Sequence, residues 1–233
     1  ILNLSMDDKH IMDLIYGIPS MTMEQWKSNL QQFFDLDLPH LSAYGLTIEP
    51  QTHLGHLVKS KQLSVAKEES YNAQFEALIT QTSERGFDHY EISNFGKPNY
   101  YSQHNTAYWF GEKYVGIGPS AHSFNGLERQ WNASSNMKYV SKLQNNEVPA
   151  EIEELSVNDK YNEYILTRLR TKWGIDKNQI KELFGTSFQN NLNLLVKPYL
   201  QSKHVLEVDD FLVLSKAGKF LADKISSDLF VVD

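Results

Sequence analysis

Residues 104–123 bring together side chains that can bind a ligand. The stretch opens with the run His104-Asn105-Thr106-Ala107-Tyr108-Trp109, carries His122 near its end and contains little charge. An imidazole can ligate a metal or carry a proton near neutral pH, and Tyr and Trp rings offer apolar faces with one polar handle each. Residue chemistry alone leaves two interpretations open: a wall of a ligand site, or a half-buried strand with core histidines.

The elements before this stretch predict a parallel sheet. Apolar runs at residues 10–19, 41–48 and 87–92 are separated by two helical segments, which is the rhythm of strand–helix units. The first run is typical of a strand buried on both faces, and Asp13 interrupts it. Because a buried unpaired carboxylate is costly, we expect Asp13 to have a partner, either a ligand or a structural salt bridge.

Two helices are predicted between these strands. Thr22 and Gln25 form a capping box at the start of the first. The second is expected from Ser64 to about Thr82, with Gly86 as its stop signal. Residues 51–63 read as an irregular loop, so the pair His53 and His56 is not expected to bind a metal.

The second strand alternates in side-chain size. Its small set, Leu41, Ala43, Gly45 and Thr47, permits two interpretations. The set could face a barrel interior and leave room for a ligand beside Asp13, or it could allow close packing against a helix.

The glycines of the run Gly116-Ile117-Gly118 superficially match a dinucleotide-binding fingerprint. No helix is predicted directly after them, so we reject that interpretation and expect close backbone approach to a ligand or strand.

The C-terminal third predicts a winged helix. Residues 126–160 are polar and poorly periodic, as in a bridge between domains. Helices are then expected from Asp159, from Asp176, over 187–201 and over 216–225, with two strands between the last two. Residues 171–233 carry eight Lys, no Arg and eight Asp plus Glu, and the third helix contains only Lys197. This balance favours a packing or partner-docking module over a nucleic-acid reader.

Four short sequence motifs, found in this order along the chain, carry a family resemblance. They are the runs at 13–19 (DLIYGIP), 41–50 (LSAYGLTIEP), 90–95 (YEISNF) and 104–109 (HNTAYW). Together they resemble the second half of the oxygen-independent coproporphyrinogen III oxidase family of radical S-adenosylmethionine proteins. The HNxxYW word is similar to the haem chaperone branch of that family rather than to the true oxidase.

The resemblance implies roles for several residues. Asp13 and Thr47 would contact S-adenosyl-L-methionine, and His122 stands where the oxidase branch has a residue near a second cofactor molecule. His104 would be the haem-iron ligand, since imidazole is a usual proximal ligand, with Tyr108 and Trp109 stacking on the porphyrin. Three cations are candidates to pair with propionates, although a surface charge is their commoner role: Lys97, Lys113 and Arg129.

The resemblance also implies a cofactor that this chain cannot hold. The family binds a 4Fe-4S cluster on three thiolates near its N-terminus, whereas the 233 residues contain no Cys and begin with Ile1. We therefore expect the C-terminal half of a longer protein. The predicted fold is α/β: part of an incomplete parallel (β/α) barrel over 1–125, a bridging segment over 126–170 and a winged-helix-like domain over 171–233.

Composition limits the function. Apolar residues make up 41% of the chain, the net charge is −7, and no apolar run is long enough to span a membrane. Together with these limits, the family resemblance implies a cytoplasmic haem-binding protein that passes haem to an acceptor protein, without catalysis by this chain alone. The alternatives are oxidative decarboxylation of coproporphyrinogen III and, disfavoured by the charge, a winged-helix regulator that binds nucleic acid.

Overall fold

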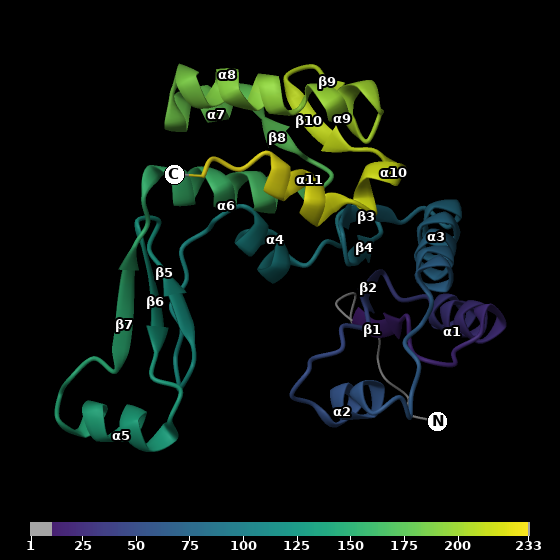
Figure 1. The fold of residues 1–233 in the computed structure, drawn as a ribbon, viewed down its shortest axis with the longest axis horizontal. Coiled ribbons are helices and arrows are strands. Elements are labelled where there is room, and N and C mark those ends of the chain that lie inside the picture. The colour runs from purple at the N-terminus through teal and green to yellow at the C-terminus, as the bar shows by residue number, and fades with distance from the viewer. Residues whose placement is uncertain (1–10, 233) are drawn as a thin grey trace. The chain divides into compact units, whose positions relative to one another are not determined.

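The computed structural model describes residues 11–232. The chain divides into two compact units, Ile1–Ser102 and Gln103–Asp233, whose elements are drawn in Figure 1. The first ten residues of the predicted barrel part, including His10 of its first strand, lie outside the described residues. The predicted division into a barrel part, a bridging segment and a winged-helix-like domain, with boundaries at residues 125 and 170, stays a prediction.

The first unit contains a four-stranded mixed sheet in the order β1-β2-β4-β3. Its elements are β1 (Ile11–Tyr16), α1 (Met23–Asp35), β2 (His40–Gly45), α2 (His53–Lys59), α3 (Glu68–Glu84), β3 (Asp88–Glu91) and β4 (Asn94–Gly96). β1 and β2 pair in parallel, as predicted. Strand β4 was not predicted, and it pairs antiparallel with both β2 and β3.

Helix α1 begins as the sequence predicts. The Thr22 hydroxyl accepts a hydrogen bond from the Gln25 backbone N–H at 3.2 Å, and the Gln25 side chain accepts one from the Thr22 N–H at 2.9 Å. This capping box satisfies two of the free donors at the helix start. The apolar face of α1 then buries Trp26, Leu30 and Phe33 completely.

One buried amide connects β1, α1 and α3. The Gln74 side chain accepts from the backbone N–H of Gly17 at 2.8 Å and donates to the carbonyl of Met21 at 3.3 Å. Its backbone carbonyl accepts from the Trp26 indole N–H at 2.8 Å. Buried polar groups must be paired in this way, so Gln74 fixes the turn between β1 and α1 against α3.

The small residues of β2 face a helix rather than an open interior. Leu41 and Ala43 are buried, and a Cβ on Gly45 would collide with the Tyr71 hydroxyl of α3. The close-packing interpretation of this set is therefore correct. The opposite face of β2 carries Ser42, in register with Asp13.

The segment around α2 and the start of α3 differ from the prediction. The segment 51–63, expected to be irregular, contains α2, which the Thr52 side chain caps through the Gly55 N–H. Position 55 of this helix requires glycine, because a Cβ there would meet the Glu49 carbonyl at 2.3 Å. Helix α3 begins at Glu68 rather than near Ser64, and its end before Gly86, at a φ of 76°, is as predicted.

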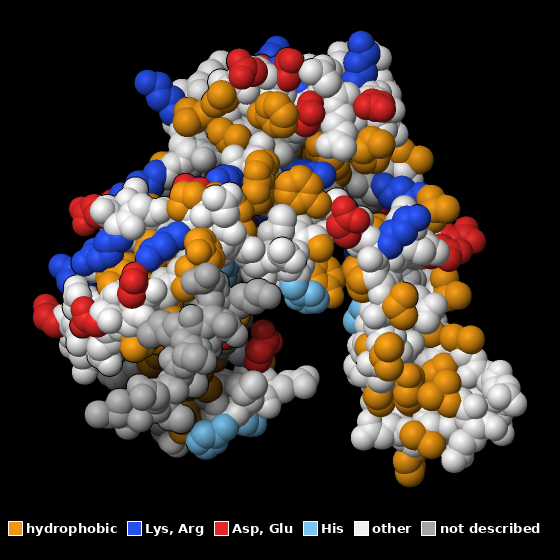
Figure 2. Space-filling view, turned by 180° about the vertical axis from the view of Figure 1, so that it is seen from behind, with side chains coloured by type: hydrophobic (Ala, Val, Ile, Leu, Met, Phe, Trp, Pro, Cys, Tyr) orange, Lys and Arg blue, Asp and Glu red, His pale blue; other side chains and the backbone are white. Residues whose placement is uncertain are grey.

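The second unit starts with a three-stranded antiparallel sheet in the order β5-β6-β7. The first elements of this unit are α4 (Gln103–Trp109), β5 (His122–Phe124), β6 (Glu128–Asn132), α5 (Asn136–Gln144), β7 (Ala150–Glu154) and α6 (Val157–Leu169). Most of the predicted bridge therefore forms this sheet and α5. Hydrophobic side chains are exposed on α5, among them Met137 and Val140, and Figure 2 shows orange side chains gathered on this lobe.

The remaining elements form a second antiparallel sheet, in the order β8-β10-β9, with helices packed on it. They are β8 (Ile175–Asp176), α7 (Lys177–Phe184), α8 (Thr186–Leu195), α9 (Lys197–Gln201), β9 (Val205–Val208), β10 (Phe211–Leu214), α10 (Lys216–Lys219) and α11 (Ala222–Asp228). The helix predicted over 187–201 is interrupted before Pro198, which has no N–H to donate to the preceding turn. The helix predicted over 216–225 is likewise two short helices. No helix within residues 11–232 is long and apolar enough to cross a membrane.

The capping box yields a first test. Replacing Thr22 by Ala removes one cap hydrogen bond, so the free energy of unfolding should fall by about 1 kcal/mol. Chemical denaturation followed by circular dichroism measures this. Gln32→Ala, at an exposed position of the same helix, should change it by less than about 0.5 kcal/mol. Equal effects of the two substitutions would contradict the role of the cap.

The Gln74 amide yields a second test. Gln74→Met keeps a similar volume but leaves the buried Gly17 N–H without its acceptor, which should cost about 1–3 kcal/mol. The loss should appear in the denaturation midpoint and in faster hydrogen exchange at the start of α1. An unchanged midpoint would mean that water replaces the amide at no cost.

Candidate functional site

The HNxxYW word lies on helix α4, not on a strand. Helical spacing places residues four apart on one face, and the rings of His104 and Tyr108 meet edge to face with centroids 4.9 Å apart. His104 is exposed and Tyr108 is 43% exposed. Of the two initial interpretations, the half-buried strand is wrong, and an accessible imidazole supported by an aromatic ring remains.

An aromatic row continues from Tyr108 into the β5–β7 sheet. Tyr108 meets Tyr114 at 4.8 Å between centroids, and Tyr114 lies 6.1 Å from Phe124 of β5. Tyr114 and Phe124 also exchange both backbone hydrogen bonds at 2.9 Å. The row fixes the side chain that supports His104 to a hydrogen-bonded sheet within the same unit.

The end of α4 contacts α6 through cations stacked on rings. The Arg168 guanidinium lies 4.0 Å from the ring centroid of Phe110 and 5.4 Å from that of Tyr164. Arg170 lies 5.7 Å from the Trp109 ring. Burial lowers the pKa of Arg168, an effect that Tyr164 and Asp176 partly oppose. Arg keeps its charge at any ordinary pH, so Arg168 is a partly desolvated cation.

A cleft of about 520 Å³ lies between α4, the β5–β6 hairpin and helices α6 and α7. Aromatic and aliphatic side chains form most of its wall, including Tyr108, Trp109, Phe110, Tyr164 and Leu183. Three cations and two carboxylates complete it: Arg129, Lys160, Arg168, Glu112 and Glu163. This is the size and composition of a site for an organic ligand, and two of the predicted site residues line it.

Arg129 of this cleft is already paired. Its guanidinium lies 2.7 Å from the Glu163 carboxylate, and both side chains are partly buried. Burial raises the pKa of Glu163, while Arg129 opposes that rise. Both residues of this ion pair line the cleft.

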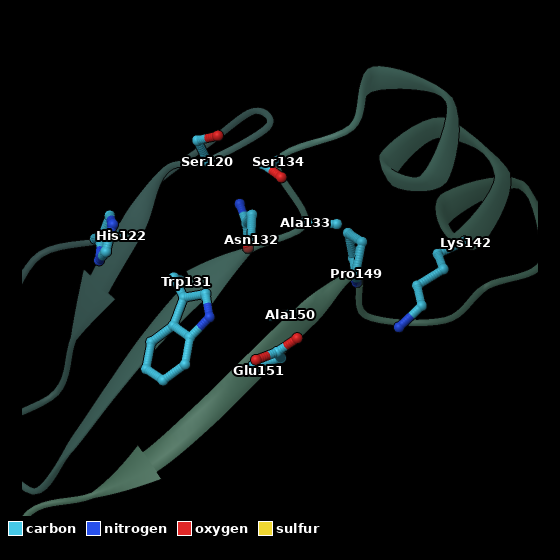
Figure 3. Close-up of a pocket in the computed structure, with 10 residues that line it drawn as sticks. All are labelled: Ser120, His122, Trp131, Asn132, Ala133, Ser134, Lys142, Pro149, Ala150 and Glu151. Carbon is cyan, nitrogen blue, oxygen red and sulfur yellow. The ribbon is translucent and has the colours of Figure 1, made fainter. Parts of the chain in front are cut away.

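His122 lines a different, more polar pocket of about 310 Å³. It lies on β5 opposite Trp131 of β6. Figure 3 shows the Lys142 and Glu151 side chains on the side of Trp131 that is away from His122. Asn132 holds the neighbouring loop by donating to the carbonyls of Gly116 and Gly118. The prediction that the glycines permit close backbone approach is confirmed for Gly116, where a Cβ would meet the His122 carbonyl at 2.1 Å. A Cβ on Gly118 would meet no atom within 4 Å, and that residue has a φ of 105° instead.

Asp13 and Thr47 lie in the first unit. Asp13 is exposed in mid-strand, with Ile11 57% and Ile15 46% exposed on the same face. The expectation of a strand buried on both faces is therefore wrong within the described residues. Thr47 is exposed and follows the end of β2. Asp13 acts on buried His40 by raising its pKa, but desolvation dominates and lowers that pKa to about 4.

The predicted site residues thus fall into separate places. His104 and Tyr108 are in contact, Tyr108 and Trp109 share the cleft, and His122 lies in its own pocket. Residues 11–232 contain no cluster of three or more His, Cys, Asp or Glu that could hold a metal ion. The sequence did not single out Phe110 or Arg168, because only the turn from α4 to β5 brings Phe110 against α6.

Three comparisons relate the chain to known proteins. Residues 155–221 match the family described as "HemN C-terminal domain". "Heme chaperone HemW" of Bacillus subtilis is 26% identical over 92% of this chain and 57% of its own length. "Heme chaperone HemW" of Lactococcus lactis is 33% identical over 76% of this chain and 46% of its own. The chain therefore spans about half the length of these relatives.

A solved structure shares the fold. Coproporphyrinogen III oxidase (HemN) from Escherichia coli, titled a radical SAM enzyme, superposes with a TM-score of 0.76 at 16% identity. The superposition covers 96% of this chain and 55% of that one. At this identity the likeness shows a common mixed α/β fold alone. The predicted resemblance is confirmed: residues 155–221 match the HemN C-terminal domain, and most of the chain is similar to proteins named heme chaperone HemW.

Proposed function

We propose that this chain is the haem-binding half of a haem chaperone, which takes up haem as cargo and passes it to an acceptor protein. The observation that carries the proposal is the exposed imidazole of His104, set edge to face against Tyr108 on α4. Imidazole is a usual axial ligand of haem iron. The similarity to proteins named heme chaperone over 92% of the chain supports the same function.

The other cofactors of the family fit this chain unequally. A 4Fe-4S cluster takes Cys thiolates, and the sequence has none, so the residues present do not fit it and no radical step is assigned to them. For S-adenosylmethionine, the exposed carboxylate of Asp13 could accept hydrogen bonds from a ribose or an amine, and the hydroxyl of Thr47 could donate or accept one. S-adenosylmethionine would supply a radical only together with the cluster.

The architecture enters the proposal as well. Parallel β1 and β2, with their helices, would form part of a (β/α) barrel. The order α6, β8, α7, α8, β9, β10 is that expected of a winged helix. With zero net charge over 171–233, this module would dock on the acceptor protein rather than on nucleic acid. A cytoplasmic location belongs to the same proposal.

Ligation by His104 is tested with haemin. Titration of the chain with haemin should give the Soret band of an imidazole-ligated haem, and His104→Ala should lose this ligation signature because the iron loses its imidazole. His56→Ala serves as the matched control, since His56 is also an exposed histidine on a short helix. The same ligation signature in the wild type and His104→Ala would remove His104 from the site.

A further inference from the structure

The cleft of the second unit contains a cation that makes no direct ion pair. Within residues 11–232, Arg168 forms no ion pair, and its guanidinium is instead stacked on Phe110 at 4.0 Å. Arg129, by contrast, is paired with Glu163. A partly buried cation is stabilised by an anion at its free edge more than an exposed one is, because less solvent screens the charge.

The rest of the wall fits a flat, apolar molecule. The rings of Tyr108, Trp109 and Phe110 follow one another at the end of α4, and Leu166 and Leu183 line the cleft from α6 and α7. Aromatic rings attract the faces of other π-systems. Lys160 adds a further positive charge to the lining. A planar aromatic ligand that carries carboxylates would satisfy both the rings and the free cation.

We propose that this cleft binds the tetrapyrrole ring itself, with one carboxylate at Arg168, and that it does so independently of the iron. The inference rests on the proposed function and deepens it. It separates the binding of the tetrapyrrole ring by the cleft from the ligation of the haem iron by His104. Tyr108 connects the two contacts, because it lines the cleft and supports the imidazole.

Metal-free protoporphyrin IX separates the two contacts, because it has the ring and the carboxylates but no iron to ligate. Titration of the full chain, followed by porphyrin fluorescence, should give saturable binding in both the wild type and His104→Ala. Arg168→Gln should weaken that binding about tenfold, the effect of one lost charged hydrogen bond. Arg85→Gln is the matched control: Arg85 lies 4.0 Å over Phe34 in the first unit, and the variant should bind like the wild type.

A substitution at an exposed residue tests the cleft without disturbing the fold. Leu183 lines the cleft and is 56% exposed, so Leu183→Glu should fold normally while its new carboxylate repels the ligand's, again weakening binding about tenfold. Leu194→Glu, at a residue of α8 that is 61% exposed and outside the cleft lining, should have no effect. Circular dichroism checks that all variants fold.

The outcomes distinguish the two proposals. No saturable binding of protoporphyrin IX, or equal binding by Leu183→Glu and Leu194→Glu, overturns the cleft assignment while leaving haemin ligation by His104 in place. Binding that depends on Leu183 and Arg168, together with a haemin ligation signature that does not depend on His104, supports the cleft and overturns the assignment of the iron ligand.

Discussion

The pitch of one short helix is the constraint on which the site depends. With 3.6 residues per turn, α4 sets Tyr108 one turn after His104, so the two rings must meet. The same turn carries Trp109, and Phe110 follows it directly into the cleft. An extended segment would instead alternate these side chains between two faces. The imidazole and the aromatic wall are therefore parts of one rigid feature.

The position of α4 depends in turn on a cation and its rings. Arg168 comes from α6 and stacks on Phe110, which also meets Trp173 edge to face at 5.1 Å between centroids. Such contacts gain strength as the cation is desolvated. They therefore hold the end of α4 against α6 while leaving the charge of Arg168 available to an anion. A Leu at this position could pack against the rings but would offer no such charge.

Local signals in the sequence predicted some elements and not others. The Thr22 capping box and the stop at Gly86 are both confirmed. They could be predicted because each depends only on residues close by in the sequence. Strand β4 was not predicted. It has only three residues, and they form a strand only because they pair with β2 and β3. The face to which the Gly45 set turns was left open for the same reason: it depends on Tyr71, twenty-six residues away. His104 could be named from its motif, but Arg168 could not, because its significance arises from tertiary contact with Phe110.

Under the proposed function, two separate contacts would suit a protein that must release its cargo. When one molecule is held at two linked points, each contact raises the effective concentration at the other, and the combined affinity exceeds either alone. Loss of one contact then removes that advantage at once. An acceptor that offers its own imidazole to the iron would compete with His104, which is exposed, while the ring stays in the cleft. The haem would leave in two steps with small barriers rather than in one step with a large barrier, which is how a tight binder can also be a fast donor.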